Sequence, residues 1–247
     1  MARGVIAVIP ARMQSTRFPG KVAYRHRGKP LLFYVWNQVR QARTVDRVVV
    51  ASDSPEVADL AASFGAEYVQ TSAKHKTGSD RVAEVAEKLP GSIYINVQAD
   101  NIGLRGRVFD PVVRWLKEHP REQYATLARK ITDERDLDRT DCTKVVGSDD
   151  KYALWFSRLP IPYLRDGASG NRVKRHRFLE HIGVYFFRPA GLAAFASWKQ
   201  APAEKAESLE QLRILSNGGR IRLFTTTARS VSIDSPHDVN AMDALIR

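Results

Sequence analysis

Val5-Ile6-Ala7-Val8-Ile9-Pro10 is an unbroken apolar run, and a polar loop rich in cationic and hydroxyl side chains follows it directly. A continuous run of this length, rich in valine and isoleucine, is typical of a strand buried on both faces of a sheet. Ligands of open α/β sheets bind beyond the carboxyl ends of the strands. The opening of the chain therefore predicts an α/β fold with a ligand-binding loop after its first strand.

Outward from this strand, short apolar runs alternate with helical patterns. We expect strands at residues 47–51, 68–70 and 93–98, and helices at 30–43, 79–88 and 108–119. Ser54 and Pro55 suit the start of a further helix, since serine caps the free N–H groups and proline lacks one. Gly65 suits the end of that helix. The alternation is typical of βαβ units around a mostly parallel sheet.

The second half of the chain has a more mixed pattern. Strands are expected at 124–131, 144–146, 153–156, 182–187 and 220–224, with helices at 189–198 and 208–216. A last helix begins at Ser235-Pro236-His237-Asp238, where a serine cap is followed three positions later by an acidic residue. We predict one domain over residues 1–247, with a mostly parallel central sheet and a mixed-sheet insertion.

Composition narrows the class of protein. Of 247 residues, 43% are hydrophobic and 27% are charged, as in globular domains, and no apolar run approaches the length of a membrane span. The N-terminal residues predict no secretory signal. The single Cys142 excludes an internal disulfide and a multi-thiolate metal site. We expect a cytoplasmic protein without a membrane partner.

The charge of the chain has several interpretations. The net charge is +12, which fits nucleic-acid binding, a pocket for small polyanions, or simply a basic solvated surface. Basic residues cluster at 172–177, in what we expect to be an exposed loop. No nucleic-acid motif and no interleaved aromatic residues accompany the cluster, so we predict no nucleic-acid partner.

The loop after the first strand combines groups that bind phosphate. It supplies cations, hydroxyls and a glycine that lets backbone N–H groups approach an anion, at Arg12, Arg17, Lys21, Ser15, Thr16 and Gly20. The spacing is not that of a P-loop, and no GxGxxG is present. A solvated basic loop is the alternative, but three cations beside two prolines and a glycine favour phosphate binding.

Distinctive short motifs occur along nearly the whole chain. In the first half they are Ile9-Pro10-Ala11-Arg12, Ser15-Thr16-Arg17-Phe18-Pro19-Gly20-Lys21, Gly28-Lys29-Pro30, Val50-Ala51-Ser52-Asp53, Thr71-Ser72, His75-Lys76-Thr77-Gly78-Ser79-Asp80-Arg81 and Asn96-Val97-Gln98. In the second half they are Tyr152-Ala153-Leu154-Trp155-Phe156-Ser157-Arg158, Ile161-Pro162, His181-Ile182-Gly183-Val184-Tyr185, Leu209-Glu210-Gln211-Leu212-Arg213 and Ile233-Asp234-Ser235-Pro236-His237-Asp238. In this order, the series resembles the 3-deoxy-manno-octulosonate cytidylyltransferases, or CMP-Kdo synthetases.

The resemblance implies a Rossmann-like nucleotide-diphospho-sugar transferase fold and a reaction. CTP is coupled to the anomeric hydroxyl of 3-deoxy-D-manno-octulosonate (Kdo), giving CMP-Kdo and pyrophosphate, with Mg²⁺ as cofactor. The partners are then CTP, an acidic sugar and a second copy of the chain in a homodimer. The resemblance also implies that the product feeds lipopolysaccharide biosynthesis.

The resemblance also assigns roles to residues. For the nucleotide these are Ala11, Arg12, Ser15, Arg17, Lys21, Thr71, Ser72, Gly78, Ser79 and Arg81. For the sugar they are Gln98, Arg158, His181, Tyr185, Glu210 and Gln211. The residues assigned to catalysis are Arg17, Lys21, Asp100 and Asp234. Asp80 has an equally good interpretation as a structural residue in the first turn of its helix.

Asp100 and Asp234 match the metal ligands of the family. Each follows an apolar, strand-like run, which places it at a strand end. Magnesium prefers hard oxygen ligands, often one or two carboxylates together with substrate phosphates. A lone aspartate at such a place is usually a turn or cap residue. Two at matching places favour a shared metal site.

One segment departs from the family pattern. After Gln98 the family usually has Gly-Asp-Glu-Pro, whereas this chain has Ala99-Asp100-Asn101-Ile102. The metal-binding aspartate is kept, but its acidic neighbour is neutral and the proline is absent. Three alternatives to a Kdo enzyme stay open: activation of another ulosonic acid, such as an amino-substituted or sialic-type acid, nucleic-acid binding, and an inactive relative.

Overall fold

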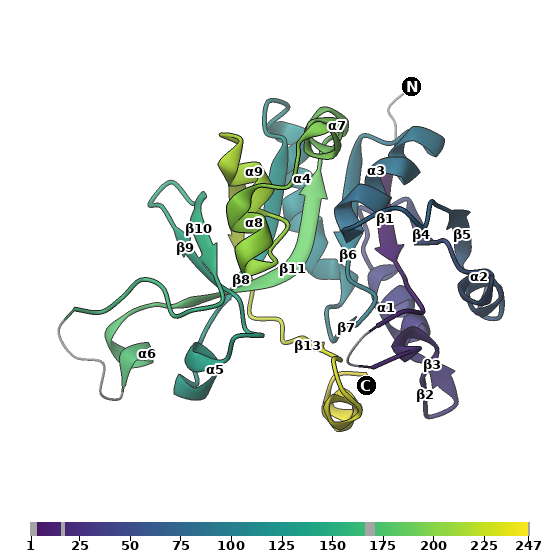
Figure 1. Ribbon diagram of the computed structural model, residues 1–247, viewed down its shortest axis with the longest axis horizontal. Coiled ribbons are helices and arrows are strands. Elements are labelled where there is room, and N and C mark those ends of the chain that lie inside the picture. The colour runs from purple at the N-terminus through teal and green to yellow at the C-terminus, as the bar shows by residue number, and fades with distance from the viewer. Residues whose placement is uncertain (1–3, 16–17, 166–170, 247) are drawn as a thin grey trace.

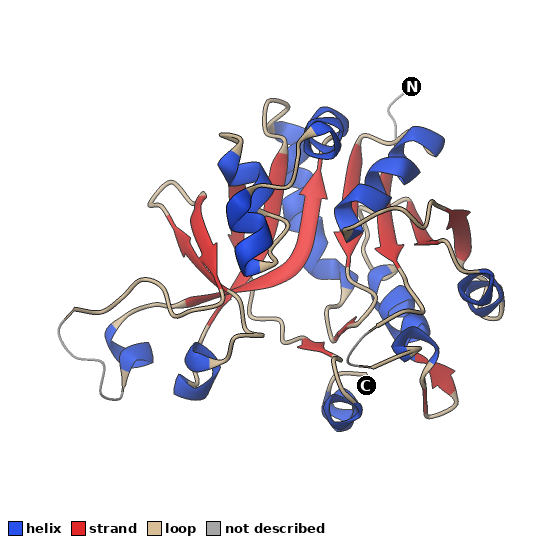
Figure 2. Ribbon diagram, in the orientation of Figure 1, coloured by secondary structure: helices blue, strands red, loops and turns tan. Residues whose placement is uncertain are grey.

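The computed structural model describes residues 4–15, 18–165 and 171–246. Its main sheet has nine strands (Figures 1 and 2). The parallel part consists of β5 (Glu67–Gln70), β4 (Arg47–Ser52), β1 (Val5–Pro10) and β6 (Ile93–Val97), in that spatial order. The predicted α/β fold with a mostly parallel central sheet is confirmed.

The mixed part of the sheet begins at β11 (Leu179–Phe187), which runs antiparallel to β6. This long strand also pairs antiparallel with β8 (Tyr124–Lys130) and with β9 (Lys144–Gly147). The outer strands are β12 (Ile221–Thr225), parallel to β8, and β10 (Ala153–Ser157), antiparallel to β9. Strands β9 and β10 extend away from the parallel part (Figure 1).

The alternation of side chains along β1 explains the two layers of helices. Val5, Ala7 and Ile9 belong to one hydrophobic core and Ile6 and Val8 to another, because successive side chains of a strand point to opposite faces. The first core packs against α1 (Leu31–Val39), α2 (Pro55–Ala62) and α4 (Asp110–Glu118). The second packs against α3 (Gly78–Lys88), α7 (Pro189–Ser197) and α9 (Leu212–Ser216).

The remaining elements are short. Around the basic loop lie the 3₁₀ helix η1 (Lys21–Ala23) and the strands β2 (Arg25–His26) and β3 (Lys29–Pro30). The 3₁₀ helix η2 (Gly106–Phe109) precedes α4. Two further strands, β7 (Asn101–Ile102) and β13 (Val231–Ser232), pair with each other, and the 3₁₀ helix η3 (Pro236–Ala244) follows β13. None of the helices in the described part of the chain is long and apolar enough to cross a membrane.

Several helix predictions hold in detail. The side chain of Ser54 accepts a hydrogen bond from Val57 N, and Pro55 opens α2 as expected. Gly65 has a φ of 74° shortly after that helix ends, in the left-handed region that glycine enters at little cost. The helix predicted at 30–43 is shorter, since α1 ends at Val39.

Other predictions are wrong. The helix predicted at 208–216 is shorter, since α9 begins at Leu212, and Ser208 adopts the left-handed conformation (φ 52°). The preceding α8 (Pro202–Glu207) was not predicted, since it is short and mostly polar. The last helix begins where it was predicted, with Asp238 Oδ2 accepting from Ser235 N at 2.7 Å, but it is a 3₁₀ helix.

The basic cluster at 172–177 is only partly the exposed loop that was expected. Arg172–Arg175 form a helical turn, α6, and Arg172 bonds to Glu134 and Asp138 at the two ends of α5 (Glu134–Asp138). One of its cations is therefore neutralised within the protein. This reduces the charge that the cluster offers to nucleic acid.

Candidate active site

Lys21, Asp100 and Asp234 meet at the carboxyl end of the parallel strands. Lys21 Nζ donates to Asp100 Oδ2 and lies 3.4 Å from Asp234 Oδ1. It also donates to the carbonyl of Ile233 at 3.2 Å. The two carboxylates retain 23% and 21% side-chain exposure, so a ligand reaches them from solvent. The predicted convergence of the two aspartates is found.

Local pairing fixes Asp234 beside Asp100. Strand β13 pairs with β7, and Ile233 N donates to the Asp100 carbonyl at 2.9 Å. Asp238 Oδ2 accepts from the backbone N–H groups of Asp234 at 3.0 Å and Ser235 at 2.7 Å. In Figure 1 the C-terminal segment accordingly lies alongside β7. The pairing holds both carboxylates at one place.

The residues at this place fit a magnesium ion that also binds substrate phosphate. The ammonium of Lys21 between two carboxylates shows that a positive charge is stabilised there. Within the described ranges, no group of three or more His, Cys, Asp or Glu side chains could hold a metal. A pair of carboxylates with open positions is the arrangement that magnesium commonly uses with nucleotide phosphates.

The departure at Asn101-Ile102 has a structural role. Both residues form β7, and Ile102 is fully buried in the first core opposite Val231. A proline would bring no N–H to such a pairing. Isoleucine thus adds an apolar contact that holds β13, and with it Asp234, against the end of the sheet.

The loop after β1 is tied to the segment before α3. Arg12 donates to the carbonyls of His75 at 2.8 Å and Thr77 at 3.3 Å. Burial and the nearby Arg81 both lower the Arg12 pKa. Ala11 is buried and its N–H bonds to Ala51 O at 2.9 Å, whereas Ser15 is half-buried. The predicted Arg17 lies outside the described residues.

Arg81 lines a small cavity next to this loop. Its guanidinium donates to Thr71 Oγ1 and, at 2.6 Å, to Asp53 Oδ1. The side chain is 1% exposed, and its Nε has no hydrogen-bond partner in the part of the chain that the structure describes. The cavity has a volume of about 250 Å³ and is lined by Arg12, Met13, Gln14, Asp53, Ser54, Glu56, Ala73 and Arg81.

The start of α3 connects the nucleotide and sugar residues. Thr77 Oγ1 accepts from Asp80 N, and Asp80 Oδ2 accepts from Thr77 N, both at 3.1 Å. Asp80 therefore has the structural role considered from the sequence, and it also accepts from Arg213. Ser79 N donates to Glu210 Oε2 at 3.0 Å, and burial raises the Glu210 pKa. Gly78 lies beside this contact, at the first position of the helix.

Three of the predicted sugar residues form one hydrogen-bonded chain. Tyr185 OH bonds to Gln211 Oε1 at 2.9 Å, and Gln211 Nε2 lies 3.5 Å from His181 Nδ1. His181 Nε2 in turn lies 2.9 Å from Thr126 Oγ1. Burial lowers the His181 pKa to about 3 and raises the Tyr185 pKa well above its usual value. These groups are neutral near pH 7.

Gln98 and Arg158 flank that chain. Gln98 Nε2 lies 3.5 Å from Asn96 Oδ1, and Asn96 Nδ2 donates to Ser79 Oγ at 3.0 Å. Arg158 donates to three backbone carbonyls, at distances of 2.7 to 3.3 Å, from Glu207, Thr140 and Ser208. These bonds hold its guanidinium beside the segment that leads to Glu210.

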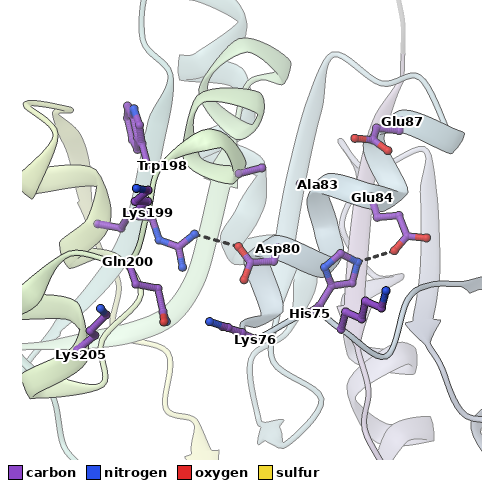
Figure 3. Close-up of a pocket in the computed structure, with 13 residues that line it drawn as sticks. His75, Lys76, Asp80, Ala83, Glu84, Glu87, Trp198, Lys199, Gln200 and Lys205 are labelled. Atoms are coloured by element: carbon purple, nitrogen blue, oxygen red, sulfur yellow. Dashed lines mark hydrogen bonds and ion pairs between the residues drawn. The ribbon is translucent and has the colours of Figure 1, made fainter.

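A hollow of about 750 Å³ lies beside the start of α3, and neither the aspartate pair nor the predicted sugar residues line it. Figure 3 shows His75, Asp80 and Glu84 on one side and Trp198, Lys199 and Gln200 on the other. Glu84, which lines the hollow, accepts hydrogen bonds from His75 and, at 2.8 Å, from Ser72 N. The predicted Ser72 therefore contacts the lining of the hollow through its backbone N–H. The hollow therefore lies beside the candidate active site and does not include the two aspartates.

Several residues of the site were not predicted. Asp53 and Asn96 stand inside motifs that carry the resemblance, so their place in those motifs was an available signal. Thr126 acts through a buried hydrogen bond to His181, and Asp238, predicted only as a helix-capping residue, also accepts from the backbone of Asp234. The Thr126 contact depends on the pairing of β8 with β11, which the sequence did not show.

The fold and the carboxylate pair beside a basic loop define a nucleotidyltransferase. A family model described as cytidylyltransferase matches residues 6–221. The 3-deoxy-manno-octulosonate cytidylyltransferase of Geobacter sulfurreducens is 38% identical, over 95% of this chain and 96% of its own length. That of Solibacter usitatus is 35% identical, over 100% and 96%. The chain belongs to the 3-deoxy-manno-octulosonate cytidylyltransferase family.

Solved structures agree with this assignment. A CMP:2-keto-3-deoxy-manno-octonic acid synthetase complexed with CTP superposes with a TM-score of 0.89 at 34% identity, covering 98% of both chains. HddC from Yersinia pseudotuberculosis, complexed with GMP-PN, gives a TM-score of 0.64 at 11% identity. The second likeness shows a shared fold alone.

Proposed function

We propose that the protein couples CTP to the anomeric hydroxyl of Kdo, giving CMP-Kdo and pyrophosphate, with Mg²⁺ as cofactor. The observation that carries the proposal is the meeting of Asp100 and Asp234 at Lys21, beside the basic loop. The family membership and the likeness to a CTP-bound synthetase support the choice of nucleotide and sugar.

The reaction is an in-line displacement at phosphorus. A bond forms between the anomeric oxygen and the α-phosphorus, the bond to the bridging oxygen of the β-phosphate breaks, and the hydroxyl proton passes to solvent. Asp100 and Asp234 would hold the magnesium ion, which supplies Lewis-acid stabilisation of phosphate charge when bound. Lys21, and Arg17 by family position, stabilise the charge of the leaving pyrophosphate.

The small cavity that Arg81 lines is suited to the cytosine base of CTP. Arg12 and Arg81 line it with N–H donors, and Asp53 lines it with a carboxylate acceptor. The pairing edge of cytosine offers both kinds of partner, with acceptors at O2 and N3 and a donor at N4. We therefore place the base beside Arg81 and Asp53, with Thr71 holding the guanidinium in place.

Product analysis tests the proposal. The protein is incubated with Mg²⁺ and each of the four nucleoside triphosphates, together with Kdo, its amino-substituted analogue or a sialic-type acid. Mass spectrometry is expected to identify CMP-Kdo as the main product. A different CMP-linked acid would reassign the sugar. No nucleotidyl transfer with any pair, from protein that is folded by circular dichroism, would overturn the proposal.

We also propose that the chain acts as a homodimer in the cytoplasm. Among the described strands, β10 is at the edge of the sheet, and it carries the exposed side chains of Leu154 and Trp155. Leu159 and Tyr163 follow it with 65% and 80% exposure. An exposed edge with large apolar side chains favours association with a second copy. The cytoplasmic location stays a prediction from the sequence.

A further inference from the structure

Four buried polar side chains form a continuous chain at the predicted sugar residues. They are Thr126 on β8, His181 and Tyr185 on β11, and Gln211 directly before α9. Thr126 is fully buried, and the other three are at most 8% exposed. Because buried polar groups need partners, each hydrogen bond in this chain constrains the next.

Thr126 sets the direction of the chain at one end. Its hydroxyl lies 2.6 Å from the Val184 carbonyl, which only accepts, so the single hydroxyl proton is donated there. Toward His181 Nε2, at 2.9 Å, Thr126 Oγ1 must therefore accept. His181 is thus neutral, with its proton on Nε2 and a lone pair on Nδ1.

The remaining two directions follow from that lone pair. Gln211 turns its amide nitrogen toward His181 Nδ1, which leaves its carbonyl oxygen facing Tyr185. Tyr185 must then donate its only proton to Gln211 Oε1, at 2.9 Å. The tyrosine oxygen keeps only lone pairs, so it offers an acceptor and no donor to a ligand.

An irregularity in the sheet brings Thr126 to this place. Ile182 pairs with Leu127 and Tyr185 pairs with Thr126, so Gly183 and Val184 have no opposite residues on β8. Such a bulge re-aims neighbouring groups of the strand. Here the Val184 carbonyl lies within reach of the threonine hydroxyl, between the two β11 residues assigned to the sugar.

The charged side chains near Tyr185 agree with its role as a hydrogen-bond acceptor. The negative charge of Glu210 and the positive charge of Arg158 both act on Tyr185. Tyr185 and Glu210 contribute acceptors to this part of the predicted sugar site, and Arg158 contributes a cation. An acidic sugar has both hydroxyl donors and an anionic carboxylate. Its hydroxyls are therefore favoured beside Tyr185 and Glu210, and its carboxylate beside Arg158.

We propose that Thr126 is a positioning residue that directs this chain, so that Tyr185 accepts a hydrogen bond from a hydroxyl or amino group of the sugar and disfavours its carboxylate. The proposal rests on the proposed function. Through this chain of hydrogen bonds, a fully buried residue determines which groups of the sugar bind at Tyr185.

Thr126→Val tests the role in binding, because valine keeps the shape but removes the hydroxyl. We expect the KM for the sugar to rise about 10-fold to 100-fold, as for loss of a buried hydrogen-bond partner, with the KM for CTP unchanged. Thr126→Ser keeps the hydroxyl and is expected to restore the sugar KM. An unchanged sugar KM in folded Thr126→Val would overturn the proposal.

The histidine tautomer tests the direction independently of activity. In the full-length protein with ¹⁵N-labelled histidine, NMR at pH 7 is expected to show His181 protonated only on Nε2, with His181→Gln identifying the signal. A proton on Nδ1 in the wild type would overturn the proposal. If no ulosonic acid were activated with CTP, the proposed function would fail, while the tautomer would still decide the direction of the chain.

Discussion

Asp100 and Asp234 both contact the ammonium of Lys21, although they belong to opposite halves of the chain. The pairing of β7 with β13 brings their backbones together, and Ile233 N donates to Asp100 O. Two carboxylates at this distance from one cation repel each other when the cation is removed. The pair is therefore suited to exchange the ammonium for a metal ion and a substrate phosphate.

Replacing Asp100 by asparagine tests the carboxylate pair. Asp100→Asn removes one negative charge but keeps the size of the side chain. With saturating Mg²⁺, we expect pyrophosphate release to fall about 10²-fold to 10³-fold, since an electrostatic contact to the transition state is weakened. Asp243→Asn is the matched control, because among the described residues Asp243 pairs with His26 and Arg27, away from Lys21. Near-normal turnover of Asp100→Asn would contradict the assignment.

Lys21→Ala separates two effects of the same cation. Without its ammonium, the two carboxylates lose their internal counter-ion. We expect Mg²⁺ to bind more tightly in isothermal titration, while pyrophosphate release falls about 10²-fold or more because the leaving group is less stabilised. Lys117→Ala, on the exposed face of α4, should change neither quantity. Unchanged pyrophosphate release in Lys21→Ala would refute its role at the phosphates.

More of the fold than of the candidate site could be predicted from the sequence. Periodicity located β1 and the helix caps because local burial and capping decide those features. Motif position located Asp100 and Asp234, but the sequence could not show that β7 and β13 pair. Thr126 had no sequence signal, since its role depends on a bulge in a neighbouring strand. The helix predicted at 208–216 begins only at Leu212, and periodicity did not show the left-handed backbone of Ser208.

The buried His181 predicts a pH dependence of stability. Its pKa is lowered to about 3 by burial, whereas histidine in the unfolded chain titrates near its model value of 6.5. Between these values the unfolded chain binds more protons, so the free energy of unfolding rises with pH. Between these two pKa values, His181 is expected to raise the free energy of unfolding by up to about 1.4 kcal/mol per pH unit. This stability is lost as the pH falls.

The measurement compares wild type with His181→Gln by urea unfolding between pH 4 and 7. The difference in the pH slope between the two proteins isolates His181 from the carboxylates, which titrate in both. Equal slopes across this range would show that His181 accepts a proton in the folded protein as readily as in the unfolded chain.

The exposed edge beside β10 predicts the oligomeric state. Leu159 and Tyr163 are the most exposed of the large apolar side chains in the described residues, and Leu154 lies close by in sequence on the strand itself. Burying such side chains between two copies removes apolar surface from water at about 25 cal/mol per Å². Leu159→Glu places a charge in that surface, so we expect sedimentation to show a dimer for wild type and a monomer for the variant at micromolar concentration. Ala193→Glu, on the exposed face of α7, is the control and should leave the dimer intact. A wild type that sediments as a monomer at every concentration would show that this edge has another partner or none.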